Sequence, residues 1–216
     1  MDGETAQERV VLCESIERLQ HPLMAGEAEI VDRAVEKRRR EFVAGRTLAR
    51  RAIGGLGFAP VPILRRGRAP VWPEGVVGSI SHCDTHCAVA VGSVARVRSV
   101  GIDLEVIGRV SDALWKYTFV ADERACLAAA PVAERDRLAT LMFSAKEAFF
   151  KMQYPLTGMM LDFTDADVTA LADGAFQLSL RTLLPTIPHV IEGRSAQPVP
   201  GIVLCQVWLG RASSGK

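Results

Sequence analysis

The chain has 216 residues, of which 49% are hydrophobic and 24% charged, enough apolar material for one large or two small globular domains. No run of about eighteen apolar residues occurs, so we expect no membrane span. The N-terminal residues are polar and acidic, so we expect no signal peptide. Five cysteines are scattered and odd in number. We therefore expect no disulfide framework and a reducing, cytoplasmic location.

The net charge of +1 hides an uneven distribution of charge along the chain. Residues 37–68 contain ten lysines and arginines and a single acid, Glu41, so this segment carries a net charge of +9. Such a cluster indicates an anionic partner, but a solvated basic helix face explains it equally well.

The first predicted element is a long helix over residues 27–56, with room for one break. Its apolar positions recur at helical spacing, and Arg39, Arg46 and Arg50 share a different face. Three glycines end this helix, and a proline-rich connector over residues 60–75 follows, carrying Arg65 near its turn.

Strands and two further helices account for the rest of the chain. Strands are predicted at residues 76–82, 87–92, 100–107, 167–171, 176–184 and 202–209, and helices at 121–130 and 133–153. Tyr154 and Pro155 are expected to end the last helix, and residues 192–201 to form a loop. The pattern predicts an α+β protein of two lobes, residues 1–101 and 102–216, although no sequence repeat relates them.

Two carboxylates stand one residue apart in the predicted strand VGIDLEV, residues 100–106. Asp103 and Glu105 would point to the same face of the strand, where their charges repel each other. A hard divalent cation such as Mg²⁺ would relieve that repulsion, because it prefers carboxylate and phosphate oxygens. Taken alone, the stretch fits an ordinary solvated strand face better.

The segment FSAKEAFFK, residues 143–151, lies late in the long second helix. Glu147 and Lys151 are four residues apart and so are neighbours on the helix surface. They are either a common exposed ion pair or part of a site. In a site, Glu147 would be a third metal-binding carboxylate or a general base, and Lys146 and Lys151 would contact phosphate oxygens.

The segment GSISHC, residues 78–83, places Ser81 and His82 where a strand ends. Both side chains can donate hydrogen bonds to a phosphate, although a lone histidine there is more often structural. The overlapping HCDTHC has zinc-ligand residue types, but four ligands within six residues of a hairpin would be crowded, so buried thiols are favoured. No nucleotide-binding glycine loop or nucleophile elbow is present.

The motifs GSISH, GIDLE and FSAKEAFFK, in this order, resemble those of the 4′-phosphopantetheinyl transferases of the surfactin-synthetase and enterobactin type. The upstream REFVAGRTLARRAI extends the resemblance, which covers roughly residues 38–155. It implies a monomer of two pseudo-twofold-related α/β lobes, with coenzyme A in the cleft between them. The implied reaction moves phosphopantetheine from coenzyme A to a carrier-protein serine and releases adenosine 3′,5′-bisphosphate.

The resemblance also implies roles for individual residues. It makes Asp103, Glu105 and Glu147 ligands of Mg²⁺, with Mn²⁺ as the alternative, and makes Glu147 and Lys151 catalytic. It further implies coenzyme A contacts for seven residues: Arg38, Arg46, Arg65, Ser81, His82, Lys146 and Lys151. Many relatives have tryptophan where this chain has Phe143, a change between aromatic packing residues.

Two other functions fit parts of the sequence. A nucleic-acid-binding module could use the basic segment 37–68, but few aromatic residues accompany it and the carboxylates would have no role. A magnesium-dependent nucleotide hydrolase would use the same acids on another phosphate ester. The transferase reading expects carrier proteins as partners, and neither nucleic acid nor membrane.

Overall fold

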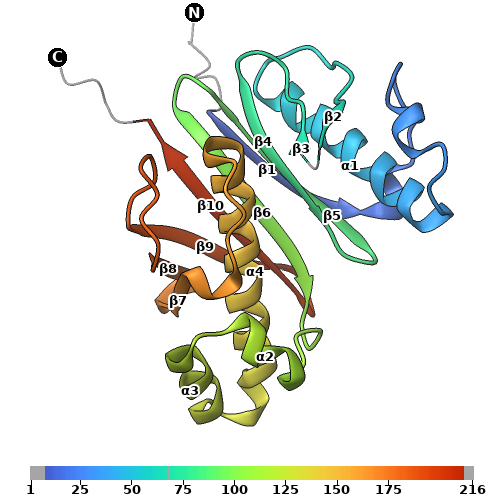
Figure 1. The fold of residues 1–216 in the computed structure, drawn as a ribbon. Helices are drawn as coiled ribbons and strands as arrows, with labels where there is room; N and C mark the ends of the chain where they lie inside the picture. Colours follow the sequence, from blue (N-terminus) through green and yellow to red (C-terminus); the bar gives the residue numbers. More distant parts are fainter. Residues whose placement is uncertain (1–7, 68, 212–216) are drawn as a thin grey trace, which may run out of the picture. The chain divides into compact units, whose positions relative to one another are not determined.

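The computed structural model describes residues 8–67 and 69–211, which form two compact units. One unit contains the chain up to Val100 and a C-terminal stretch that starts at Leu209, and the other contains Gly101–Trp208. Figure 1 shows the helices and strands of both. The sequence placed the first division one residue later and assigned the whole C-terminal strand to the second lobe.

The first unit is built on a three-stranded antiparallel sheet in the order β1-β5-β4. The strands are β1 (Arg9–Ser15), β4 (Val76–His82) and β5 (His86–Ser93). β1 was not predicted, although its residues pair with β5 along their whole length. A small ribbon of β2 (Arg65–Arg66) and β3 (Ala69–Pro70) lies in the connector, and two 3-10 turns, η1 (Ile16–Leu19) and η2 (Ala28–Val31), precede the long helix.

Helix α1 (Glu36–Gly55) packs against β5 and supplies much of the core of the first unit. Its apolar face includes Leu48, Ala52 and Ile53, each at most 1% exposed. The predicted helix over residues 27–56 is therefore two elements, η2 and α1, with the break before Glu36. The part after the break, α1, carries Arg38 and Arg46, two of the residues expected to contact coenzyme A.

The second unit contains a five-stranded sheet in the order β6-β10-β9-β8-β7. Its strands are β6 (Val97–Val106), β7 (Ala166–Ala170), β8 (Ala175–Leu180), β9 (Val190–Val199) and β10 (Ile202–Gly210), and 3-10 turns η3 (Phe163–Asp165) and η4 (Ala172–Gly174) flank β7. Helix α4 (Val132–Thr157) packs against β7, β8 and β9, and the shorter helices α2 (Asp112–Thr118) and α3 (Ala121–Ala129) precede it. Phe176, Leu178 and Met152 are fully buried in the core.

The prediction of a loop at residues 192–201 is wrong, because most of that stretch belongs to β9. Gly193 and Pro198 made it look like a loop. Gly193 is required because a Cβ there would collide with the ring of Phe176. Pro198 lies beyond the part of β9 that pairs with β8, where a missing backbone N–H removes no bond to that neighbour.

The expected end of α4 at Pro155 is also wrong, since the helix continues to Thr157. Proline removes one backbone donor, but this cost is smaller in a last turn that is closed by other bonds. Gly158, in the left-handed conformation, caps the helix by donating its N–H to Tyr154 O at 2.9 Å. Across residues 8–67 and 69–211, none of the helices combines the length and apolarity needed to cross a membrane.

Candidate active site

Strand β6 and helix α4 of the second unit approach each other closely at Gly101. A Cβ at this position would lie 2.6 Å from Met152 N and closer still to Ala148 O, both backbone atoms of α4. Only glycine permits this approach, which brings Asp103 and Glu105 of β6 near Glu147 and Lys151 of α4. The sequence showed this glycine, but its packing role could not be read without the helix.

Asp103 and Lys151 are joined across this contact. Lys151 Nζ donates to Asp103 Oδ1 at 2.7 Å, and the Asp103 side chain is only 9% exposed. Glu105, two residues on, accepts the N–H of Val106 and lies 4.0 Å from Arg109. The solvated strand face that residues 100–106 would indicate by themselves is therefore not observed at Asp103, which is a buried, charge-paired carboxylate.

Glu147 lies near both acids of β6. Burial raises the pKa of Glu147 above its ordinary value, the Lys151 ammonium lowers it, and the charges of Asp103 and Glu105 raise it. Three carboxylates that act on one another in this way concentrate negative charge at one place. Lys151 and the more distant Arg109 only partly offset that charge, so the group favours a further cation.

The donor chemistry of these three carboxylates fits a hard divalent ion. In the part of the chain described, however, no three acidic, histidine or cysteine side chains are arranged to hold a metal as they stand. Lys151 Nζ instead contacts Asp103. Lys151 Nζ would therefore compete with a metal for Oδ1 of Asp103.

A pocket of about 240 Å³ lies in the first unit, between α1, β4 and the β2-β3 ribbon. Its polar lining combines Arg38, Glu41 and Arg46 of α1 with Arg65 and His82, and Phe42, Gly45, Pro70 and Ile80 complete it. Four of the residues expected to contact coenzyme A therefore line one pocket. A phosphate group is the natural occupant of such a concave surface with three guanidinium groups.

Arg46 is the most buried cation of this pocket. It is 6% exposed, its guanidinium lies 4.2 Å from the centre of the Phe42 ring, and its Nε has no hydrogen-bond partner among the described residues. Burial lowers the pKa of Arg46 to about 10, opposed by Glu27, while neighbouring arginines lower it further. A buried cation with an unused donor is stabilised by an anion that enters the pocket.

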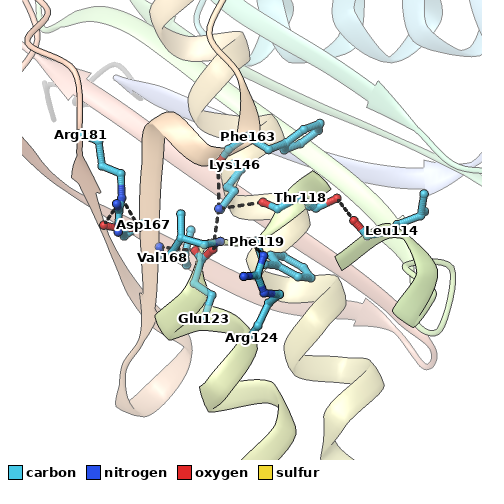
Figure 2. A network of polar contacts seen from close by, with 11 residues as sticks. Leu114, Thr118, Phe119, Glu123, Arg124, Lys146, Phe163, Asp167, Val168 and Arg181 are labelled. Carbon is cyan, nitrogen blue, oxygen red and sulfur yellow. Dashed lines mark hydrogen bonds and ion pairs between the residues drawn. The ribbon is translucent and has the colours of Figure 1, made fainter. Parts of the chain in front are cut away.

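Lys146, which was expected to contact a phosphate, is engaged in a buried network of the second unit, and its role toward coenzyme A stays a prediction. Figure 2 shows its Nζ donating to Glu123 Oε2 at 2.7 Å, to Phe163 O at 2.8 Å and to Thr118 O at 3.0 Å. The side chains of Lys146 and Glu123 are each 3% exposed. Burial lowers the pKa of Lys146, and its bond to Glu123 opposes that shift.

Glu123 completes this buried network, which the sequence did not reveal. Its carboxylate also accepts the N–H of Val120 at 2.9 Å and that of Val168 at 2.7 Å. The Glu123–Lys146 pair therefore ties the start of α3 and the end of α2 to α4 and β7 (Figure 2). Its function is to hold these elements together.

Ser81 and Glu41 also differ from expectation. Ser81 is 6% exposed and does not line the pocket, although its neighbour His82 does. Glu41 was visible in the sequence as the single acid of the basic segment, but its place among the arginines depends on the fold.

Comparison with known proteins identifies the family. The description "4'-phosphopantetheinyl transferase N-terminal domain" matches residues 26–92, and "4'-phosphopantetheinyl transferase superfamily" matches residues 99–197. The 4'-phosphopantetheinyl transferase Svp of Streptomyces mobaraensis is 43% identical over 175 residues, 80% of this chain and 70% of that protein. The chain belongs to the 4′-phosphopantetheinyl transferase superfamily.

Other relatives agree. The 4'-phosphopantetheinyl transferase PptT of Mycobacterium tuberculosis is 40% identical over 152 residues, 68% of this chain and 65% of that protein. Enterobactin synthase component D of Salmonella typhimurium is 36% identical over 169 residues, 76% of this chain and 67% of that protein. A solved holo-[acyl-carrier-protein] synthase of Thermotoga maritima matches 54% of this chain and 65% of its own at 20% identity, with a TM-score of 0.44.

The expected activity is confirmed at the level of the family. The protein is a transferase that moves the phosphopantetheine arm of coenzyme A to a carrier protein. The family match favours this activity over the two alternatives, nucleic-acid binding and nucleotide hydrolysis.

Proposed function

We propose that the pocket of the first unit binds the 3′-phosphate end of coenzyme A through Arg46, Arg38, Arg65 and His82. The observation that carries this proposal is the buried guanidinium of Arg46, whose Nε has no hydrogen-bond partner among the described residues. Arginine suits a phosphate because its planar fork donates two parallel hydrogen bonds. Arg38 and His82, both partly exposed, can reach an entering anion.

We propose that Asp103, Glu105 and Glu147 hold Mg²⁺, or Mn²⁺ in its place. The proposal rests on the oxygen donors of all three side chains and on their mutual effect on the pKa of Glu147. When bound, such an ion neutralises charge on the pyrophosphate of coenzyme A as the bond to phosphorus breaks. The remaining chemistry belongs to the side chains of the protein.

Glu147 and Lys151 supply the proton chemistry in this proposal. The serine oxygen of the carrier attacks the phosphorus that bears the pantetheine arm, and the bond to adenosine 3′,5′-bisphosphate breaks. Glu147 takes the serine proton, a role that its raised pKa favours over an ordinary carboxylate. Lys151 releases Asp103 and stabilises the negative charge on the leaving phosphate.

The partner in this proposal is an acidic acyl or peptidyl carrier-protein domain, and the enzyme itself works in the cytoplasm. Cys13, Cys83, Cys126 and Cys205 are thiols, as a reducing compartment requires. We propose, from the family resemblance, that the enzyme acts as a monomer. A fatty-acid, polyketide, nonribosomal-peptide or siderophore carrier would each satisfy the chemistry.

The test incubates the protein with coenzyme A, Mg²⁺ and one apo carrier of each type, and then measures the carrier mass. We expect a gain of one phosphopantetheine on at least one carrier, and loss of that gain in Asp103→Asn. The variant Asp84→Asn is the control, because Asp84 forms an exposed ion pair with Lys37 outside the pocket. Normal transfer by Asp103→Asn would remove Asp103 from the site.

A further inference from the structure

Glu41 places a carboxylate in a pocket that otherwise gathers positive charge. It is the single acid among the described residues that line the pocket, and it is 9% exposed. A buried negative charge here repels a phosphate, so Glu41 would weaken phosphate binding unless it also had a favourable effect. Its contacts indicate such an effect: Glu41 Oε2 lies 3.4 Å from Arg38 Nη1 and 3.6 Å from His82 Nε2.

The protonation of His82 follows from its contact with Arg38. Arg38 Nη1 lies 2.9 Å from His82 Nε2. A guanidinium has donors and no acceptor, so Nε2 accepts this hydrogen bond and carries no proton itself. The imidazole is therefore neutral in this state, and Arg38 provides the positive charge that faces Glu41.

An entering phosphate changes this arrangement through Arg38. The Arg38 side chain is 50% exposed, so its guanidinium is able to turn toward an anion. His82 Nε2 and Glu41 Oε2 would then both lose their contact with Arg38 Nη1. A proton on Nε2 replaces it, because the new N–H can donate to Glu41 and the imidazolium also faces the phosphate.

We propose that binding of phosphate groups in this pocket is coupled to uptake of one proton from solvent at Nε2 of His82. Glu41 is the positioning residue that accepts the new N–H, and it makes the uptake possible without an unpaired charge. The proton comes from water or buffer, and no other bond changes. This inference rests on the proposed function, in which the pocket receives the 3′-phosphate of coenzyme A.

The other ionisable groups around His82 do not give the same signal near neutral pH. Arg46, whose pKa is about 10, is already charged, and the guanidinium of Arg65 has hydrogen-bond donors only. Cys83 follows His82 as a buried thiol, and on β5 the ring of His86 is engaged by Thr85 Oγ1 at 2.9 Å, outside the pocket. Lys37 pairs with Asp84 on the exposed surface.

The ligand itself contributes the opposite sign. A phosphate monoester loses its second proton near pH 6, and surrounding arginines promote that loss. Binding of adenosine 3′,5′-bisphosphate to cations alone would therefore release protons. Net uptake must come from the protein.

The experiment is calorimetric titration of the full chain with adenosine 3′,5′-bisphosphate at about pH 7.5, in two buffers of very different ionisation enthalpy. An ordinary histidine is about one-tenth protonated at that pH, so full coupling gives an uptake of more than about half a proton per ligand. The association constant should also fall as the pH rises through the range in which His82 loses its proton in the complex.

Three variants decide the assignment. Glu41→Gln and His82→Gln should bind with uptake reduced at least about threefold, and Asp84→Asn, a neutralised acid on the nearby surface, should keep the wild-type value. Wild-type binding without uptake overturns the coupling, and unchanged uptake in Glu41→Gln overturns the role of Glu41. If the wild type does not bind the bisphosphate, the proposed function fails instead, and the inference falls with it.

Discussion

The substitution Gly101→Ala tests whether the close approach of β6 and α4 builds the acidic group. The new Cβ would lie 2.6 Å from Met152 N and closer to Ala148 O. Nonbonded heavy atoms prefer about 3.5 Å, so strand and helix must separate by more than about 1 Å. Because both obstacles are backbone atoms, no side-chain rotation relieves the clash.

We expect the cost at the upper end of the range for overpacking, about 3 kcal/mol. For a chain of this size each kcal/mol lowers the melting temperature by about 2–4 °C, so the variant should melt about 6–12 °C below the wild type. Separation should also lengthen the 2.7 Å contact between Lys151 and Asp103 and reduce turnover more than coenzyme A binding.

Scanning calorimetry and a transfer assay well below the melting transition measure the two effects. Gly54→Ala is the matched control, because a Cβ there meets nothing within 4 Å and alanine favours the helix by up to about 1 kcal/mol. A Gly101→Ala protein that melts within about 2 °C of the wild type, with normal turnover, would refute the reasoning.

Four further results are expected. Arg46→Ala should raise the KM for coenzyme A by at least about tenfold with kcat changed less, as loss of a charged hydrogen bond requires; a kcat loss above a thousandfold at saturating coenzyme A would contradict this. Lys146→Met should lower the free energy of unfolding, measured by denaturant titration, by about 3–5 kcal/mol, because it leaves the buried Glu123 without its partner. The control Lys37→Met, which breaks the exposed Lys37–Asp84 pair, should lower it by less than about 1 kcal/mol. The raised pKa of Glu147 makes its ionisation destabilising, so Glu147→Gln should be more stable than the wild type at pH 7.5 and equal to it below the ordinary carboxylate pKa; equal stability at both values would disprove the assignment. Coenzyme A with Mg²⁺ should raise the melting temperature, and Asp103→Asn should lose the part of the shift that depends on Mg²⁺.

Sequence reasoning succeeded where one local pattern determines the structure. The short apolar runs of β4, β5 and β6 were readable because these strands are largely buried, and the helical stripe of α4 because that helix buries one face. It failed for β9, whose Gly193 is explained by the ring of Phe176 on a neighbouring strand. It also missed β1, which lies against β5 although most of its residues are only partly buried.

Among the site residues, too, those marked by a local pattern were predicted, and contacts between distant parts of the chain were not. Arg38, Arg46, Arg65 and His82 were predicted from charge, spacing and resemblance, and all four line one pocket. The buried pair that Lys146 forms with Glu123 was not predicted, because Glu123 is 23 residues away in the chain. The role of Glu41 was equally hidden, because it arises from a contact with a strand 41 residues later.

The network around Lys146 has a consequence for experiments that mutate every position of the chain. Lys146 and Glu147 are consecutive, yet substitutions at the two positions should have different effects. Substitution of Lys146 should lower the amount of folded protein in the cell, and substitution of Glu147 should lower the turnover of each folded molecule. A screen that records only product would score both positions alike. Measuring abundance beside product would separate them, and would show that a short signature in this family mixes residues under two different selective pressures.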